Sequence, residues 1–191
     1  MNDSKFNPKL LEALKSVGYQ SFSDEQIGII KHCNSGQSHL FFSQKEKQQL
    51  ELTLACLVHI LSHHNRDVPR ALCLFPDDET LAFADTFFKS ISGFTDLKLL
   101  SIPQNHDIDF IEEQFEENID LVFGVADEVW SYVKLLVFGL GNISHFFIFN
   151  LDTFFDNESI ASVEAITLQL PTPCRHIHSA QLPTASVLKW Y

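Results

Sequence analysis

Short apolar runs alternate along the chain with longer segments in which apolar residues recur at helical spacing. The runs predict strands at residues 39–42, 71–75, 98–102, 121–125, 146–149 and 175–178, of which the last is the most polar. The longer segments predict helices at residues 9–17, 24–33, 45–63, 77–90, 107–116, 127–136 and 159–168, and another after Pro183. Strands that are mostly apolar throughout and alternate with helices are typical of a mainly parallel sheet. The pattern therefore predicts an α/β fold of three layers, with helices on both faces of the sheet.

One domain accounts for the whole pattern. The 191 residues contain no internal repeat, no low-complexity tract and no linker long enough to divide them. With 45% hydrophobic residues and 18 phenylalanines, the chain can build one substantial core. We expect a single domain over residues 1–191, with a helical segment of residues 1–35 packed on it.

The charge balance bears on the partners of the protein. The chain carries 13 lysines and arginines against 25 aspartates and glutamates, a formal net charge of −12. Nucleic-acid-binding proteins gain much of their affinity from basic side chains placed against phosphates, and a negative field repels a polyanion. The composition therefore favours a protein partner over RNA or DNA.

The sequence shows no sign of a membrane segment or of export. No stretch approaches the roughly 20 consecutive apolar residues of a membrane-spanning helix, and residues 1–5 open no signal-peptide pattern. The cysteines lie far apart and mostly among apolar neighbours, which is typical of reduced core thiols and not of a disulfide or a zinc site. They are Cys33, Cys56, Cys73 and Cys174. We expect a cytoplasmic protein.

The loop after the first predicted strand lies where a fold of this class would hold a ligand, because open parallel sheets bind ligands at the carboxyl ends of their strands. A phosphate-binding loop needs glycines that let backbone amides turn inward, a lysine for the terminal phosphates and a hydroxyl for magnesium. Residues 43–50 read Ser-Gln-Lys-Glu-Lys-Gln-Gln-Leu and place none of these where it is required.

From Phe6 to Trp190, the order and spacing of these segments resemble the first of the two RecA-like domains of the DEAD-box RNA helicases. The resemblance implies a RecA-like fold of the P-loop NTPase type, with ATP and magnesium as the family's ligands. Phe6 and residues 18–26 are similar to the aromatic residue and the glutamine motif that recognise adenine, and Gln26 is kept. Ser23 and Gln26 also form a Ser-x-x-Gln capping box for the second helix, so a structural interpretation of Gln26 stays open.

The family's phosphate loop falls on residues 43–50 without gaps. Glu46 and Gln48 stand where the resemblance implies glycines, Gln49 where it implies the lysine, and Leu50 where it implies the threonine. An inward-pointing carboxylate at Glu46 would also oppose a triphosphate. The resemblance therefore predicts a fold that lacks a functional phosphate loop.

The D-E-A-D box, which holds magnesium and positions the attacking water in the family, falls on residues 149–152. Phe149 and Asn150 replace its first two acids, and only Asp152 is kept. The family's S-A-T segment resembles Ser179-Ala180-Gln181, of which Ser179 and Ala180 match. We expect a surviving hydrogen bond between Ser179 and Asp152, but no catalytic residue.

Acids occupy the segments that resemble the family's RNA contacts. Residues 76–81 are similar to its P-T-R-E-L-A motif and contain Asp77 and Asp78. Residues 125–128 align with its T-P-G-R motif and place Glu128 at the arginine. Because carboxylates repel phosphates, the resemblance predicts that both RNA contacts are lost.

Two histidine patterns invite a metal interpretation. Cys56, His59 and His63 lie at helical spacing and can share one face, but no fourth ligand is evident. We favour the alternative that the histidines interact with the dipole at the end of their helix, and we expect no metal site. His176 and His178 alternate on a predicted strand, a pattern that is typical of packing.

Aromatic residues bracket the position of the D-E-A-D box. Phe146, Phe147 and Phe149 precede it, and Phe154 and Phe155 follow it. These rings either fill the crevice that holds magnesium in the family or offer an apolar surface to a partner. The acids of residues 107–117 are interpreted as the solvated face of a helix.

We interpret the chain as a non-catalytic helicase-like module that binds another protein and needs no nucleotide or other cofactor. The first alternative is a residual nucleotide-binding or ATPase domain that uses Phe6 and Gln26 for adenine and unrecognised residues for phosphate. The second alternative is a nucleic-acid-binding domain that needs no ATP, which the net charge of −12 disfavours.

Overall fold

The structure is a computed structural model that describes residues 6–33, 35–61, 69–105, 108–115 and 118–191. The strands are β1 (His39–Phe42), β2 (Ala71–Phe75), β3 (Leu99–Ile102), β4 (Leu121–Val125), β5 (His145–Ile148) and β6 (Arg175–Ala180). The helices are α1 (Pro8–Ser16), α2 (Asp24–Cys33), α3 (Glu46–Leu61), α4 (Asp78–Ser92), α5 (Ile108–Phe115), α6 (Ala126–Lys134), α7 (Leu151–Asp156), α8 (Ile160–Gln169) and α9 (Ala185–Trp190), with a 3₁₀ turn η1 (Leu140–Asn142). The fold is therefore one of alternating strands and helices.

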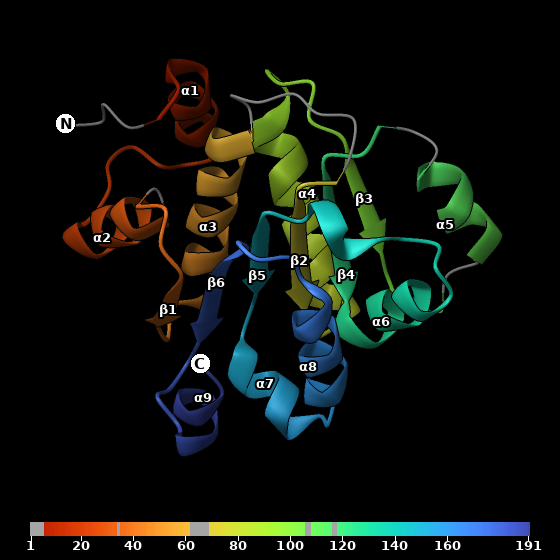
Figure 1. Ribbon diagram of the computed structural model, residues 1–191. Coiled ribbons are helices and arrows are strands. Elements are labelled where there is room, and N and C mark those ends of the chain that lie inside the picture. The colour runs from red at the N-terminus through yellow and green to blue at the C-terminus, as the bar shows by residue number, and fades with distance from the viewer. Residues whose placement is uncertain (1–5, 34, 62–68, 106–107, 116–117) are drawn as a thin grey trace.

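The strands form a single sheet in the order β1-β6-β5-β2-β4-β3, and each neighbouring pair is parallel. Parallel neighbours need crossover connections, and the helices supply them. In Figure 1 the arrows of the sheet point the same way, so the strands end along one edge. The register pairs Phe42 with Ala180 and Ile148 with both His178 and Leu74, which brings the ends of β1, β6, β5 and β2 together.

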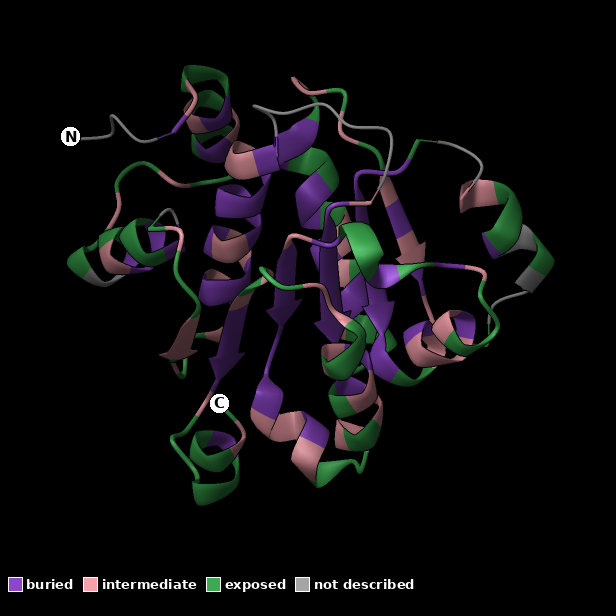
Figure 2. Cartoon of the chain, in the orientation of Figure 1, coloured by how far each residue is buried: buried purple, intermediate pink, exposed green. Residues whose placement is uncertain are grey.

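Helices cover both faces of the sheet and create two hydrophobic cores. Alternate residues of a strand point to opposite faces. In β2, Cys73 and Phe75 join the core beneath α1 to α4, whereas Leu72 and Leu74 join the core beneath α5 to α9. Figure 2 shows buried strands between helices whose outer sides are exposed. The three-layer α/β/α prediction is confirmed.

Local sequence signals explain where the first and fourth helices begin. Pro8 occupies the first turn of α1, where its missing amide hydrogen costs nothing, and the Asn7 side chain accepts a hydrogen bond from the Lys9 amide at 2.9 Å. The Asp77 carboxylate caps α4 in the same way, accepting from the Thr80 amide at 2.7 Å. These caps satisfy amides that have no partner inside the helix.

Gly124 allows β4 to lie very close to the helix that follows it. A Cβ atom at this position would be 2.3 Å from a methyl carbon of Val129 on α6 and 3.3 Å from Ile102 on β3. Glycine is therefore required by the close approach of these elements, because any side chain would displace α6. This contact places α6 directly beyond the carboxyl end of β4.

The periodicity predicts the boundaries of most elements to within two residues. The predicted bounds of β1, β2, β4 and α2 agree with the structure, whereas β6 continues two residues past its predicted end and β5 ends at Ile148. The pattern does not predict α7, because its 6 residues are too few to display a helical period. Asn150 precedes α7 in a left-handed conformation with φ at 54°, which asparagine tolerates better than most residues.

Candidate functional site

The candidate site lies where β1, β6, β5 and β2 end, the edge at which an open parallel sheet holds ligands. The loop after β1 is tied to the end of β6, because the Ser43 amide donates to the Ala180 carbonyl at 3.1 Å. Helix α3 then begins at Glu46. The loop after β5 returns to β2, since the Phe149 amide donates to the Leu74 carbonyl at 3.0 Å. The four strand ends and their loops are thus joined by backbone hydrogen bonds.

The segments resembling the D-E-A-D and S-A-T motifs meet at this edge, but the predicted hydrogen bond between Ser179 and Asp152 is wrong. The Ser179 hydroxyl instead accepts from the backbone amide of Asn150 at 3.0 Å. Both carboxylate oxygens of Asp152 accept from the backbone amide of Gln181, at 3.2 and 3.1 Å. The Ser179 side chain therefore binds the backbone of the 149–152 segment, and the Asp152 side chain binds the backbone of the 179–181 segment. Ala180 is fully buried.

Gln181 and Glu46 form a side-chain hydrogen bond at this edge that the sequence does not predict. The Gln181 amide nitrogen donates to the carboxylate of Glu46, in the first turn of α3. Helix α3, the segment after β6 and helix α7 are thereby linked, because the backbone amide of Gln181 also donates to Asp152. The two partners are 135 residues apart in the chain, and no local motif marks them.

One helical turn further on, Gln49 and Leu50 both point into the protein. Gln49 is 2% exposed, and neither its amide nitrogen nor its amide oxygen has a hydrogen-bond partner among the residues that the structure describes. Leu50 is buried and packs in the core beneath α1 to α4. A buried polar group without a partner is unusual and costs free energy, so Gln49 requires a physical account.

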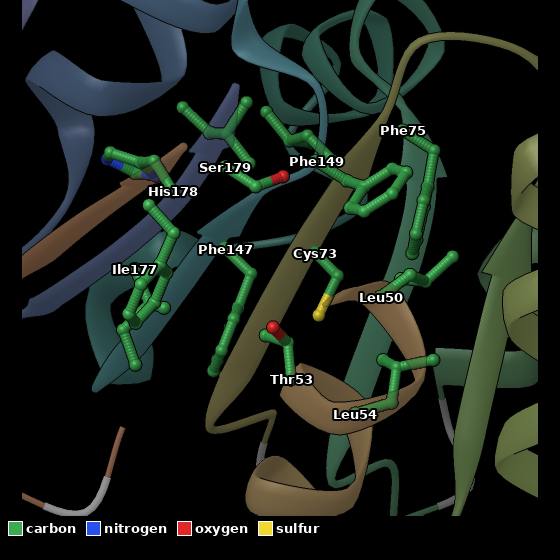
Figure 3. Close-up of a pocket in the computed structure, with 13 residues that line it drawn as sticks. Leu50, Thr53, Leu54, Cys73, Phe75, Phe147, Phe149, Ile177, His178 and Ser179 are labelled. Atoms are coloured by element: carbon green, nitrogen blue, oxygen red, sulfur yellow. The ribbon is translucent and has the colours of Figure 1, made fainter. Parts of the chain in front are cut away.

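Rings and aliphatic side chains fill the space beneath the strand ends. Leu50 and Thr53 of α3, Cys73 of β2 and Phe147 of β5 converge on one small cavity (Figure 3), whose volume is about 20 Å³. Phe149 is 7% exposed and also lines this cavity. A volume of this size holds about one water molecule, far less than a triphosphate.

The aromatic residues around the D-E-A-D position divide between the two faces of the sheet. Phe147 and Phe149 belong to the core beneath α1 to α4 and line the small cavity, whereas Phe146 and Phe154 belong to the opposite core. Phe155 is half-buried and packs against that same opposite core. Part of the aromatic set therefore lines the small cavity, because neighbouring strand residues point to opposite faces.

Gln26 performs the capping role that its spacing predicts. Its side-chain oxygen accepts from the Ser23 amide at 2.6 Å, and the Ser23 hydroxyl accepts from the Gln26 amide at 3.3 Å. Phe6 is buried and packs edge-to-face against Phe22 and His59, with ring centroids 6.1 and 5.5 Å apart. The structure thus places Gln26 and Phe6 in the same region but gives each of them an internal partner.

A cleft of about 600 Å³ lies beside Gln26. Its walls come from the segment between α1 and α2, including Gly18 and Tyr19, and from α3, including Lys47 and Glu51. The Tyr19 hydroxyl donates to the Glu51 carboxylate, and burial together with this bond raises the pKa of Tyr19 above its usual range. This hydrogen bond was not predicted, and it connects the N-terminal helical segment to α3.

The acids at the predicted RNA-contact positions hold neighbouring loops. Asp78 accepts from the backbone amide of Gln104 at 2.9 Å, and Glu128 accepts from that of Asn105 at 3.2 Å. Two acids from different segments thus bind consecutive amides of the loop after β3. Asp127 accepts hydroxyl hydrogen bonds from Ser159 and Ser162 at 2.8 and 2.5 Å. These carboxylates therefore have structural partners and give this surface a negative charge.

The first two residues of the Cys56, His59 and His63 pattern have internal partners, and His63 lies outside the described residues. His59 accepts a hydrogen bond from the Asn7 amide at 3.4 Å and packs against Phe6. Burial, followed by contact with Cys33, raises the pKa of the Cys56 thiol well above its usual value. Within residues 6–33, 35–61, 69–105, 108–115 and 118–191, no cluster of histidine, cysteine and acidic side chains suits a metal ion.

The sheet order, the helical layers and the loops at the carboxyl edge define a RecA-like α/β domain. Among solved structures, the chain is similar to a DEAD box protein from the hyperthermophile Methanococcus jannaschii, with a TM-score of 0.91 and 18% sequence identity. The match covers 100% of this chain and 52% of that one, so the chain spans about half the length of the solved protein. No protein-family model and no curated protein matches the sequence. At this identity the likeness establishes the fold, and the RecA-like prediction is confirmed.

None of the helices in the described part of the chain is long and apolar enough to cross a membrane.

Proposed function

We propose that the chain is a non-catalytic helicase-like module that acts by binding another protein. The observation that carries the proposal is the small size of the cavity beneath the strand ends, about 20 Å³. A domain that hydrolyses ATP needs an open crevice at this edge for the phosphates and the metal. The space here is taken by Leu50, Phe147 and Phe149.

The polar groups at the same edge support the proposal. Glu46 stands at a position where the family's loop turns amides toward phosphate, and its carboxylate is bound to Gln181. A negative charge there opposes a triphosphate. Asp152 is the one acid kept from the D-E-A-D box, and it accepts from the Gln181 amide instead of facing an open site. Asn150 is buried and hydrogen-bonded to Ser179 through its amide.

Thermal-shift titration with ATP, ADP and AMP, each with and without magnesium, tests the proposal. A ligand present at 100 times its dissociation constant stabilises a protein by about 2.7 kcal/mol, or about 5–11 °C for a domain of this size. We expect no shift at millimolar nucleotide and no phosphate release. A magnesium-dependent shift accompanied by ATP hydrolysis would refute the proposal.

A residual adenine site is the second candidate function, and the cleft of about 600 Å³ beside Gln26 favours it. This cleft lies outside the filled edge and has room for a base and a ribose. Gln26→Glu keeps an oxygen acceptor for the Ser23 amide, so the capping box should survive the change. A stabilisation by AMP that disappears in Gln26→Glu, with an unchanged melting temperature of the free protein, would establish adenine binding. The matched control is Gln20→Glu, which alters an exposed glutamine outside the cleft.

RNA binding is disfavoured by the negative surface at the predicted contact segments. Asp78 and Glu128 both lie there and hold the loop after β3. We expect a fluorescein-labelled single-stranded RNA to show no change in anisotropy at physiological salt. Salt-sensitive binding that is strengthened by Asp78→Asn or Glu128→Gln would show instead that RNA approaches this surface.

A further inference from the structure

A second cleft lies on the opposite side of the sheet from the filled cavity, between α8, α9 and β6. Its volume is about 580 Å³. His176 and His178 of β6 line it together with Trp190 and Tyr191 at the end of the chain, and α9 folds back so that this end lies beside β6 (Figure 1). Glu164 and Leu168, one helical turn apart on α8, line it as well.

The His178 ring packs edge-to-face against the other three rings of the cleft. The His178 ring lies 5.5 Å from His176 at 84°, 5.3 Å from Trp190 at 65° and 5.9 Å from Tyr191 at 88°, measured between ring centroids. Tyr191 is half exposed, so the cleft is open to solvent on that side. The buried His178 packs edge-to-face against the other three rings, which line the cleft, and the negative face of an aromatic ring attracts a cation.

The charges of the cleft are negative or absent. Burial, followed by the neighbouring His176, lowers the pKa of His178 to about 3, and burial also lowers the pKa of His176. Both imidazoles are therefore neutral at physiological pH and do not repel a cation. Glu164 contributes a carboxylate, and the described residues that line the cleft include no lysine or arginine. The chain as a whole carries a net charge of −12.

We propose that this cleft binds an arginine or lysine side chain of a partner protein. His176, Trp190 and Tyr191 would hold the cationic group beside the buried His178, Glu164 would supply the opposite charge, and Leu168, which is 86% exposed, would pack against the apolar part of the same side chain. This inference rests on the proposed function as a protein-binding module and adds the chemistry that the partner must present. The chain uses the same interaction internally, where Lys134 lies 5.8 Å from the ring centroid of Trp130.

The two tryptophans provide both a reporter and an internal control. Their indole N–H groups give separate NMR signals, and Trp130 lies on α6, outside the cleft. The probe is a blocked Gly-Gly-Arg-Gly-Arg-Gly-Gly peptide, and the matched control peptide carries citrulline, the uncharged analogue, in place of arginine. We expect the arginine peptide to shift the Trp190 signal and leave the Trp130 signal in place, and the citrulline peptide to shift neither.

Substitutions in the cleft measure how much Glu164 and Trp190 each contribute to the affinity for the arginine peptide. Glu164→Gln should weaken binding of the arginine peptide about threefold, as expected for a solvent-exposed ion pair. By isothermal titration calorimetry, which does not need the Trp190 signal, Trp190→Leu should weaken binding about tenfold, and Trp190→Phe, which keeps a ring, should weaken it less. Glu113→Gln, the same charge change at an exposed position on α5, should leave the affinity unchanged. An unshifted Trp130 signal in the free variants shows that they remain folded.

Three results would overturn the inference. The first is equal binding of the arginine and citrulline peptides, which would make the cleft an apolar groove without preference for charge. The second is a Trp190 signal that stays in place at millimolar arginine peptide. The third is preferential binding of a uridine oligonucleotide at Trp190, which would make the cleft a base-stacking surface. ATP binding at the carboxyl edge would refute the proposed function without moving the Trp190 signal, so the two failures are distinguishable.

Discussion

Gln49 offers the most direct test of how the carboxyl edge is built. Its side chain is 2% exposed, and both of its polar atoms lack a partner among the described residues. When the chain is aligned with the DEAD-box helicases that it resembles, Gln49 falls at the position of the lysine that binds the terminal phosphates. If the crevice is closed, the amide serves no ligand, and its burial is a cost to folding. Gln49→Met removes both polar atoms and nearly conserves volume and flexibility.

The magnitude follows from the cost of an unpaired amide. Burying such a group without hydrogen bonds costs about 1–3 kcal/mol in proteins. Methionine at this position should therefore increase the free energy of unfolding by about 1–3 kcal/mol. For a domain of this size, each kcal/mol corresponds to about 2–4 °C in melting temperature. The Thr53 hydroxyl donates a hydrogen bond of 2.9 Å to the backbone carbonyl of Gln49, and the substitution of the Gln49 side chain leaves this bond in place.

Urea denaturation followed by tryptophan fluorescence measures this difference, and the slope of the transition checks that the denatured state is unchanged. Gln169→Met is the matched control, because Gln169 is exposed at the end of α8 and its replacement should change stability by less than about 0.5 kcal/mol. A loss of more than about 1 kcal/mol in Gln49→Met would refute the reasoning, since it would mean that the amide makes hydrogen bonds that stabilise the fold.

Three further changes test other parts of the structure. Gly124→Ala should lower the free energy of unfolding by about 1–3 kcal/mol, because its methyl group meets α6; an unchanged urea midpoint would contradict this packing. Asp120→Asn should lower the free energy of unfolding by about 3–5 kcal/mol, because it leaves the buried guanidinium of Arg70, 2.6 Å away, without its carboxylate. A decrease of less than about 1 kcal/mol would contradict this role of the ion pair. Burial, then Arg175 and Arg70, lower the pKa of His145 from 6.5 to about 4. The unfolded chain therefore takes up a proton between those values that the folded chain does not, so stability should fall as the pH drops from about 6.5 to 4, and His145→Asn should flatten the decline.

The strand that sequence patterns describe least well illustrates the limit of local periodicity. Residues 175–178, Arg-His-Ile-His, are mostly polar, and the pattern therefore predicts only a short, weak strand there. In the structure β6 is 6 residues long and lies between β1 and β5, with His178, Ser179 and Ala180 all buried. Its length comes from backbone bonds to strands on both sides, which a single-strand pattern does not contain.

In the candidate site, too, local contacts were predicted from the sequence and contacts between distant segments were not. The Ser23 and Gln26 capping box is local, with its partners 3 positions apart, and was predicted correctly from spacing. The pairing of Ser179 with Asp152 was wrong, because spacing cannot decide which of two neighbouring atoms a hydroxyl reaches. The cleft beside Trp190 was not predicted, because His176 and His178 were interpreted as packing and its other walls come from α8 and α9.

The sequence by itself determined the alternation of strands and helices, the α/β class and the residue types at each motif position. These features depend on periodicity and on the identity of residues within a few positions of one another. Only the tertiary structure decided that Glu46 binds Gln181, that Gln49 is buried without a partner among the described residues, and that Phe147 and Phe149 line the small cavity while Phe146 belongs to the opposite core. Such contacts depend on the order β1-β6-β5-β2, and that order is established by packing between segments distant in the chain.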